Sequence, residues 1–479
     1  MRLTQRSPQL TPSPPRWSRD LAEIWGIQNI VIEQLSPQVL GEQLQLRSLT
    51  AGLTWRKKAH LRAASYWFSH VSPEADHRDL AQRYREAHYH LVELQEWPIA
   101  QQILWMPLGR YPLHRQLWFW GHHHEALELL SPLLSQVGES WQCFLLYEIG
   151  QVQTVLGNHE AAHQAFQQQI ALAQTLQLPR ALVKGYGGLG RLYSYYQAQV
   201  PKARHYYQQQ LQLARHCQDD LEESLALDGL GRVGFLCGQW RQSTQFYRQA
   251  WQLIQTLDEP EMQQSLFLRL EGSCLRWSSV KKHRRPFQHQ LEIAQSAGNP
   301  LQIWEAAHNL ASADAQTQQY EAALASFEVA IAAAKESQNS RNYSISMAAQ
   351  GACYARMNAW PQAIACTKSA IPGIQQAKDP VAEAICWFNL SYCFSELHQP
   401  FQALRCATQI RRLAYQTASG YIWGMFYLAI AYAQWQQRHW IKSLGLAGFG
   451  IFYLGWWRSA DGRLALAKLF SVLRMIMRQ

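Results

Sequence analysis

Apolar side chains recur along most of this chain at the three- and four-residue spacing of helices that bury one face. Residues 60–71 and 84–104 show this spacing in the first third of the chain. The string LDGLGRVGFLCGQWRQSTQFYRQAWQLI at 227–254 shows it again, with two glycines seven residues apart and a Trp two residues after the second. The pattern therefore predicts an all-α protein.

The pattern around Gly231 returns along the chain at a near-constant period. We call its position the anchor, and successive anchors follow a period of 40, with one interval of 41. The anchors are Gly150, Gly190, Gly231, Glu271, Ala311, Gly351, Ser391 and Ala431. A near-constant period of this length predicts a stack of helix hairpins, each of which completes its core against the next.

Two further columns follow the anchor. Small residues lie twelve positions after it, at Ala162, Ser243, Ala323, Ala363, Ala403 and Ser443, and aromatic residues lie sixteen after it, at Phe166, Tyr247, Phe287 and Phe327. In the second repeat, Ala203 and Tyr207 come one residue late. Small side chains on both helices of a hairpin let their backbones approach closely, and an aromatic ring fills the remaining gap. Glycines 157 and 238 are predicted to end the first helix of their hairpins.

The strings LGRLYSYY, QYEAALASFEVAI and GACYARMNAWPQAIACTKSAI resemble the tetratricopeptide repeat (TPR) over residues 142–447, about two thirds of the chain. The period of 40 differs from the usual 34 and resembles TPR variants of peptide-sensing regulators and scaffolds. The resemblance implies a right-handed superhelical solenoid of eight hairpins. The fourth repeat is degenerate, with Glu271 at the anchor and His283 at the small position.

The chain is predicted to have four parts. Residues 1–16 are predicted to be a disordered tail, 17–140 an irregular helical domain, 141–447 the repeats, and 448–479 a basic amphipathic helix. The irregular domain is similar to the helices that join the ATPase and the sensor of STAND-type regulators. No GxxxxGK[ST] motif is present, so the resemblance implies a sensor without the ATPase.

Composition places the protein in a reducing, cytoplasm-like compartment. Nine cysteines without CxxC spacing are predicted to be reduced, small hydrophobic residues. No signal peptide is visible, and no apolar run reaches the length of a membrane span. The net charge is +10, and the residues from Arg438 onward contribute more than half of it.

The chain is predicted not to be an enzyme and to need no cofactor or metal. His122, His123 and His124 are adjacent, so they point to different sides of a helix. HExxH and GxSxG motifs are absent, and the glycines of GYGGLG (185–190) open a helix rather than follow a strand. The basic run VKKHRRPF (280–287) is typical of a solvated turn, with contact to acidic protein or phosphate as the alternative. The basic residues form no continuous face, which argues against nucleic acid as a partner.

The resemblance to TPR proteins places a partner groove on the first helix of each hairpin, at positions just before and after the anchor. These positions hold Lys184, Arg191, Tyr195, Asp228, Arg232, Phe235, Arg276, Glu305, His308, Arg356, Phe388, Tyr392 and Trp435. Arg191 and Arg232 share a column, and paired arginines can hold a carboxylate. The expected partner is a protein or peptide that is acidic or ends in a free carboxylate. A groove filled by internal ion pairs is the alternative.

The last residues carry a second candidate surface. In RLALAKLFSVLRMIMRQ (463–479), an apolar stripe runs through Leu466, Leu469, Phe470, Leu473, Ile476 and Met477, and Lys468 and Arg474 lie off it. With Trp456 and Trp457 before it, this segment is predicted either to cap the last repeat or to dock on a membrane surface or partner.

The sequence therefore favours a non-enzymatic scaffold, assembly factor or regulator that binds a partner segment in its groove. Two alternatives stay open: a ligand- or peptide-sensing signalling regulator, and a peripheral membrane assembly factor that docks through its C-terminal tail.

Overall fold

The computed structural model shows a protein built almost entirely from helices. The only strands among the residues that it describes are β1 (Pro107–Leu108) and β2 (Tyr111–Pro112), an antiparallel pair. This confirms the predicted fold class, a helical repeat solenoid of TPR-like hairpins. The described residues are 23–27, 37–50, 52–69, 77–108, 111–120, 122–196, 199–237, 239–257, 263, 266, 270, 284–298, 300–337, 339–417 and 419–454.

The chain divides into two compact units. Unit 1 takes residues 1–116, 128–146 and 171–181, and unit 2 takes residues 117–127, 147–170 and 182–479. Each unit has its own buried core.

Helices of unit 1 confirm the periodicity of the first third of the chain. The predicted apolar stretch at 60–71 falls in α3 (Trp55–Ser69), which pairs with α2 (Pro37–Ser48). The stretch at 84–104 divides between α4 (His77–Glu93) and α5 (Trp97–Ile103). Three side chains from this unit, Leu44, Phe68 and Leu91, are fully buried. The short elements that follow β2 are α6 (Leu113–Phe119), α7 (His123–Leu130) and the 3₁₀ helix η2 (Ser131–Leu133).

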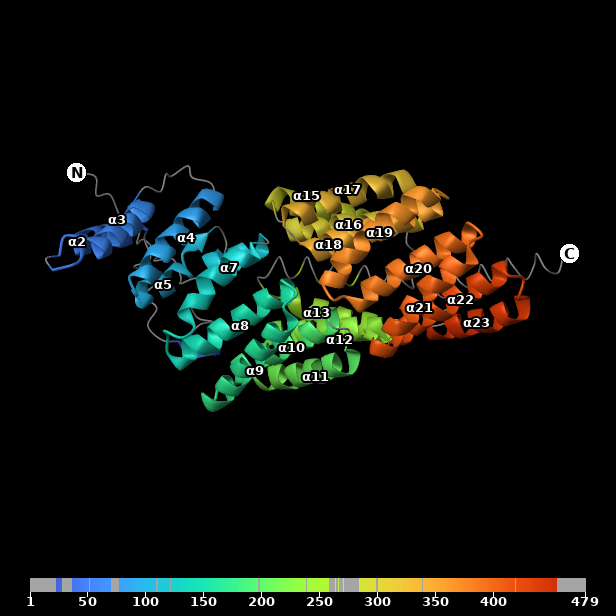
Figure 1. The fold of residues 1–479 in the computed structure, drawn as a ribbon. Coiled ribbons are helices and arrows are strands. Elements are labelled where there is room, and N and C mark those ends of the chain that lie inside the picture. Colours follow the sequence, from blue (N-terminus) through green and yellow to red (C-terminus); the bar gives the residue numbers. More distant parts are fainter. Residues whose placement is uncertain are drawn as a thin grey trace, which may run out of the picture. The chain divides into compact units, whose positions relative to one another are not determined.

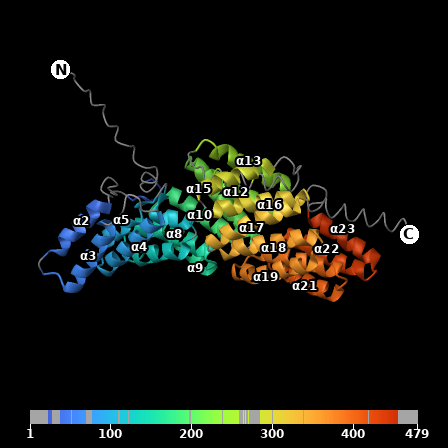
Figure 2. The ribbon, with the colours of Figure 1, turned by 90° about the horizontal axis from the view of Figure 1, so that it is seen from above.

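The predicted period appears as alternating helices, which we call A and B (Figures 1 and 2). The A helices are α8 (Glu139–Val155), α10 (Pro179–Arg191), α12 (Asp220–Leu236), α16 (Pro300–Gln316), α18 (Ser340–Arg356), α20 (Pro380–Glu396) and α22 (Gly420–Gln436). The B helices are α9 (His159–Thr175), α11 (Val200–His216), α13 (Trp240–Ile254), α15 (Arg284–Ala297), α17 (Tyr320–Glu336), α19 (Trp360–Gln376), α21 (Pro400–Thr417) and α23 (Trp440–Tyr453).

The two helices of a hairpin meet at the small residues, as predicted. The Ser243 hydroxyl of α13 donates to the backbone oxygen of Gly231 on α12 at 2.7 Å, and Ser443 of α23 makes the same bond to Ala431 on α22. A Cβ atom on Gly231 would lie 2.8 Å from the Tyr247 ring, so the aromatic column occupies the space that the glycine leaves. The close approach of A and B helices is thereby confirmed.

The single interval of 41 has a local cause. A π-helical turn, η3 (Leu192–Tyr196), continues α10 after its anchor, Gly190. A π-turn accommodates one extra residue without ending a helix. The late positions of Ala203 and Tyr207 follow from this insertion, because α11 begins only after it.

Most turns of the array end the preceding helix with one residue in the left-handed backbone region. Gly157 has φ +81°, which confirms the predicted role of that glycine, whereas Gly238 lies outside the described residues. Non-glycine residues take the same place in the later A-to-B turns, at Gln318, Asn358, His398 and Arg438. The following N–H bonds back to the helix, as from Ala359 to Tyr354 O at 3.0 Å. This is a Schellman-type helix end.

Candidate partner-binding site

The later A helices of unit 2 contact one another. α16 contacts α18, α18 contacts α20, and α20 contacts α22. Side chains at the columns around the anchor therefore meet across these helices. We call the side chains of these columns, from Tyr147 to Trp435 on α8 to α12 and on α16 to α22, the A-helix strip; residues 271–283, between its two parts, lie outside the described residues.

A buried ion pair lies at the first end of the strip. The Lys184 ammonium on α10 is 2.8 Å from Glu222 Oε1 on α12, and the two side chains are 17% and 4% exposed. Gln210 of α11 donates to the other carboxylate oxygen, Glu222 Oε2, at 2.8 Å. The Lys184 ammonium also lies 5.9 Å from the centre of the Tyr147 ring. Both oxygens of this carboxylate therefore have partners within the protein.

The electrostatics of this pair follow from its burial. Burial alone would raise the pKa of Glu222, but Lys184, Gln210 and the nearby Arg191 together lower it. Burial likewise opposes the charge of Lys184, yet Glu222 and Tyr147 raise its pKa. Both groups are therefore charged at neutral pH. Arg191 adds a second positive charge beside the pair, and Asp219 and Glu148 add negative charges close to Lys184 and Tyr147.

The middle of the strip holds a neutral hydrogen-bonded group. The Ser346 hydroxyl of α18 accepts from the Trp304 indole nitrogen of α16 at 2.9 Å and lies 3.2 Å from His308 Nδ1. Burial lowers the pKa of His308 to about 4, so its ring is neutral at pH 7. Ser346 therefore links the Trp304 indole and the neutral His308 ring through its single hydroxyl oxygen.

Aromatic rings dominate the other end. Tyr392 of α20 lies 5.5 Å from Tyr432 of α22 and 6.0 Å from Trp360 between ring centres, in edge-on arrangements. Burial, and then the neighbouring Glu396, raise the pKa of Tyr392 to about 12, so the phenol keeps its proton. Arg356 of α18 lies close enough to oppose that rise and is exposed. This end combines apolar ring surface with an accessible cation.

The remaining predicted groove residues fall into three groups. Asp228 is buried at 7% exposure, and Arg232, Glu305 and Trp435 are half-buried. Phe235 and Phe388 pack at the edge of one core cluster with residues of α21 and α22. Arg276 and the side chain of Tyr195 lie outside the described residues, as do Trp456, Trp457, Lys468, Phe470 and Arg474.

Sequence reasoning missed three residues of the polar end: Tyr147, Gln210 and Glu222. The period contains the signal for Glu222, because Glu222 stands 38 positions after Lys184, whereas the anchors of the two helices are 41 apart. The offset of three residues is close to one helical turn. Gln210 lies on a B helix, which the groove columns did not include. Lys184 is engaged by Glu222 within the protein, as the internal ion-pair alternative requires, so its ammonium is not open to a partner in this state.

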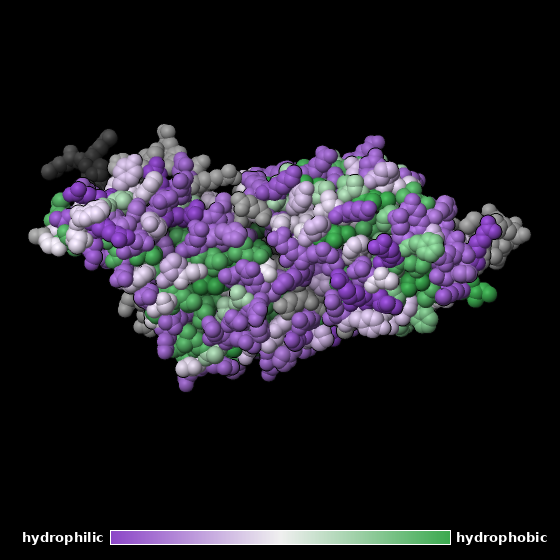
Figure 3. All heavy atoms as spheres, viewed as in Figure 1, coloured by the Kyte–Doolittle hydropathy of each residue, from purple (hydrophilic) through white to green (hydrophobic). Residues whose placement is uncertain are grey.

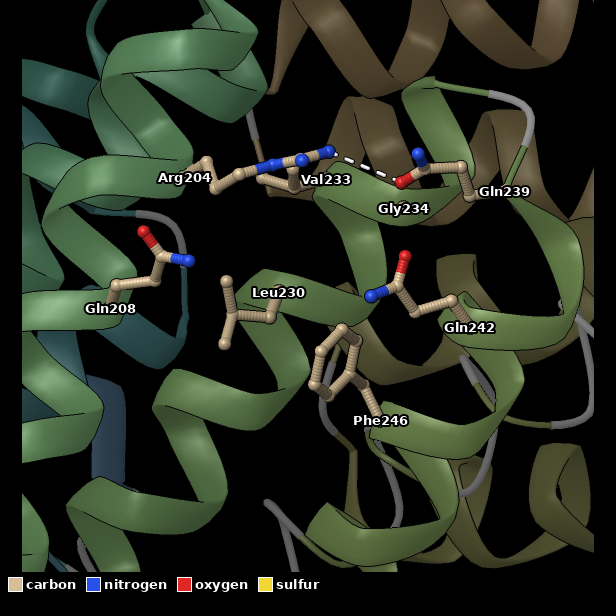
Figure 4. Close-up of a pocket in the computed structure, with 8 residues that line it drawn as sticks. All are labelled: Arg204, Gln208, Leu230, Val233, Gly234, Gln239, Gln242 and Phe246. Atoms are coloured by element: carbon tan, nitrogen blue, oxygen red, sulfur yellow. Dashed lines mark hydrogen bonds between the residues drawn. The ribbon is translucent and has the colours of Figure 1, made fainter.

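A small pocket of about 70 Å³ lies between α11, α12 and α13 (Figure 4). Arg204 spans its upper side and donates to Gln239 Oε1 at 3.1 Å, while Leu230, Val233 and Phe246 provide apolar lining. Ligand sites usually have volumes of roughly 300–1,000 Å³, so this pocket is well below their range. It fits a few water molecules or one side chain, and it is too small for a peptide.

The other candidate groups have ordinary structural roles. His122 lies 3.2 Å from Glu125, His123 is buried and His124 is exposed, so the three rings face different surroundings. No three metal-ligating side chains gather anywhere in the described ranges. Arg284, at the end of the basic run, pairs with Asp314 at 2.7 Å.

The burial of the thiols bears on the expectation of reduced, apolar cysteines, and the length of the helices bears on the expectation that no segment spans a membrane. Five of the eight cysteines that the structure describes are buried, and burial raises the pKa of Cys386 to about 12 and those of Cys393 and Cys406 to about 11. Among the helices that the structure describes, none combines the length and apolar character needed to cross a bilayer.

No protein-family model and no curated protein matches this chain. Solved structures that resemble it include a STAND protein with a tetratricopeptide repeat sensor from Pyrococcus horikoshii, at 14% identity and TM-score 0.43 over 85% of this chain and 56% of that one. A Rap protein complexed with Competence and Sporulation Factor aligns at 12% identity and TM-score 0.47, over 74% and 99% of the chains. Yeast Tom70 aligns at 9% and TM-score 0.37, over 91% and 96%.

This chain thus spans little more than half the length of the STAND protein. At such low identities the similarities concern the helical repeat fold alone, and TM-scores below 0.5 carry no argument about partners or activity.

Proposed function

We propose that this protein is a non-enzymatic interaction protein that binds a segment of a partner protein along its A-helix strip. One observation carries the proposal: the A helices carry arginine and aromatic side chains that are half-buried or exposed, at Arg191, Arg232, Arg356, Tyr392 and Trp435. Tyr, Trp and Arg are the residue types that contribute most to binding at protein interfaces. Their partial exposure leaves surface for a partner, whereas a core would enclose them.

The charges of the strip indicate the chemistry of the partner. Glu222 already has Lys184 and Gln210 as partners, and Arg191 and Arg232 share one column on neighbouring A helices, both half-buried. A carboxylate, either of an acidic side chain or of a chain end, is the natural complement to two such arginines. The Tyr392–Tyr432 end then suits an apolar side chain of the same segment.

The titrating groups support a role without catalysis. The raised pKa values of the buried thiols keep them protonated, so they are poor nucleophiles at neutral pH.

Charge reversal on the strip tests the proposal. We expect Arg191→Glu with Arg232→Glu to lose a defined partner that the wild-type protein retains in affinity capture followed by mass spectrometry. Arg241→Glu with Arg248→Glu is the matched control, because both residues are exposed on helix α13 outside the strip. Synthetic peptides that cover the sequence of the captured partner are then prepared. Calorimetry measures the affinity of each peptide for the wild-type protein and for both double variants.

The two outcomes are distinct. Loss of at least tenfold in affinity, about 1.4 kcal/mol, with the strip variant alone supports the assignment. If the double variant of Arg191 and Arg232 binds the segment as tightly as the double variant of Arg241 and Arg248, the A-helix strip is not the binding site.

A further inference from the structure

Hairpins that are far apart in the sequence touch each other within unit 2. The Ser419 hydroxyl, just before α22, donates to the backbone oxygen of Leu236 at the end of α12, at 3.3 Å. His159 Nε2 at the start of α9 lies 3.3 Å from the backbone oxygen of Ala377, in the turn before α20. Ser419 and His159 are each only 3% exposed. The array of unit 2 therefore turns back on itself at two buried contacts.

Two apolar side chains bridge the same hairpins. Phe235 on α12 packs against the core cluster of α20 to α23, and Val381 on α20 packs against both that cluster and the cluster of α9 to α12. Both side chains are half-buried. Figure 3 shows hydrophobic residues gathered over α21 to α23, so Phe235 joins an apolar region of unit 2. We call Phe235 and Val381, together with the contacts of Ser419 and His159, the seam.

The Ser419 hydroxyl serves the seam instead of its own helix. Asp219, Asn339 and Asp379 are the N-cap residues of α12, α18 and α20, and each accepts a hydrogen bond from the first turn of its helix. Ser419 is the N-cap residue of α22, and its side chain makes no such bond. The hydroxyl instead reaches the last turn of α12, where carbonyl groups have no partner within their own helix. A contact between distant hairpins thus takes the place of a local cap.

The seam lies on part of the proposed partner surface. Phe235 follows Arg232 by one helical turn on α12, and Phe388 precedes Tyr392 by one turn on α20. The sequence predicts both phenylalanines as groove residues, and both pack against the cluster of α20 to α23. In this state the array itself therefore covers apolar surface that a partner segment beside Arg232 would contact.

We propose that the seam is an autoinhibitory contact, which a partner segment must open to reach the whole A-helix strip. This inference rests on the proposed function, because it concerns access to the same surface. Neutral hydrogen bonds contribute little net stability, since water replaces them when they break. The two bridging side chains are half-buried, so the seam is weak beside the cores of the hairpins. Binding energy gained at the strip can therefore shift the array from closed to open.

Closure has a quantitative consequence for binding. A strip that is accessible only in open molecules binds with an apparent affinity that is reduced by the open fraction. A variant that raises this fraction tenfold should therefore tighten binding tenfold. Because linkage is reciprocal, a bound segment should in turn open the seam.

Ser419→Asp opens the seam while it supports the local helix. Aspartate is a preferred N-cap residue, so it can accept the bond from the first turn of α22 that Ser419 does not accept. Its carboxylate also faces the carbonyl groups at the negative end of α12, which weakens the seam. We expect the open fraction to rise about tenfold. Ser419→Ala, which removes only the donor, should act in the same direction to a smaller extent. Asn339→Asp is the matched control, because Asn339 is an N-cap residue outside the seam.

Two measurements follow the seam and the strip separately. Pulsed electron paramagnetic resonance measures the distance between labels at Asn158 and Lys378, two exposed residues beside the contact of His159 with Ala377. Labels attached to introduced ketone side chains leave the native cysteines unmodified. We expect one short distance in the otherwise wild-type protein, and a second, longer distance in Ser419→Asp. The same longer distance should appear when the synthetic peptide of the partner that binds most tightly is added. Calorimetry with that peptide should give a Kd about ten times lower for Ser419→Asp and an unchanged Kd for Asn339→Asp.

Every other pattern overturns the proposal. If Ser419→Asp and Ser419→Ala both leave the label distance unchanged, the seam does not hold the array closed. If the distance lengthens but Ser419→Asp binds the peptide no more tightly than Asn339→Asp, the seam does not inhibit binding. Failure of the proposed function has a different sign, since Arg191→Glu with Arg232→Glu would then leave the affinity for the peptide unchanged.

Discussion

The buried pair of Lys184 and Glu222 sets a pH range for the stability of unit 2. The lowered pKa of Glu222 stabilises the fold above its ordinary value of 4.5, and this contribution is lost as pH falls through the folded pKa. The raised pKa of Lys184 stabilises the fold below its ordinary value of 10.5, and this contribution is lost at higher pH. The pair therefore contributes fully between about pH 5 and pH 10.

We predict that Lys184→Met destabilises the protein by about 2–4 kcal/mol at pH 7, because it leaves a buried carboxylate with only Gln210 as a direct partner. Lys184→Met with Glu222→Gln should recover part of this loss. Urea unfolding at several pH values measures both variants. A cost of Lys184→Met that stays constant down to pH 3 would contradict the assigned pair, since protonation of Glu222 should reduce it.

At the scale of elements, the turns offer a test of their backbone geometry. Gln318 has φ +64°, a conformation that favours glycine, and its side chain is exposed. We predict that Gln318→Gly raises the unfolding free energy by about 0.5–1 kcal/mol. Gln316→Gly, two residues earlier in α16, is the control and should lower it by a similar amount, because glycine weakens a helix. If both variants change the unfolding free energy in the same direction, residue 318 does not have a left-handed backbone conformation.

The close contact between α12 and α13 concerns a glycine inside a helix. Here we expect that replacing the glycine destabilises the protein. Gly231→Ala should gain helix propensity, yet its Cβ would meet the Tyr247 ring at 2.8 Å. We expect a net loss of about 1–3 kcal/mol. Gly445→Ala on α23 has nothing within 4 Å and should instead be neutral or stabilising. Thermal unfolding compares the two variants, and adding Tyr247→Leu to Gly231→Ala should relieve the loss.

The elements were predictable because their determinants are local and repeat. Anchor, small and aromatic columns mark the contacts within each hairpin, and Ser243 with Gly231 bears this out. The π-turn at Leu192–Tyr196 was visible only as an interval of 41, since a single extra residue does not show where it is accommodated. The pairing of Lys184 with Glu222 was missed because it joins two A helices through different columns, about six residues before one anchor and nine before the next.

At the scale of the whole molecule, periodicity identifies neighbours along the array and nothing more distant. Within unit 2, the Ser419 hydroxyl bonds to the backbone oxygen of Leu236 at 3.3 Å, and His159 lies 3.3 Å from the backbone oxygen of Ala377. These residues are 183 and 218 positions apart. Such contacts depend on the accumulated rotation from hairpin to hairpin, which small deviations in each repeat determine. The rotation between successive hairpins, and with it these contacts, could therefore not be predicted from the sequence pattern.

The turns at both ends of a hairpin share one geometry, since Gln218 and Lys378 in B-to-A turns adopt the same positive φ as Asn358 and His398 in A-to-B turns. The turns before and after a hairpin therefore have the same backbone geometry. Genetic duplication or loss of one complete hairpin would leave every remaining turn intact, whereas an insertion of another length needs a local adjustment such as the π-turn at Leu192–Tyr196. An array of this kind can lengthen or shorten over evolution in whole hairpins and so change the length of the surface that its A helices form.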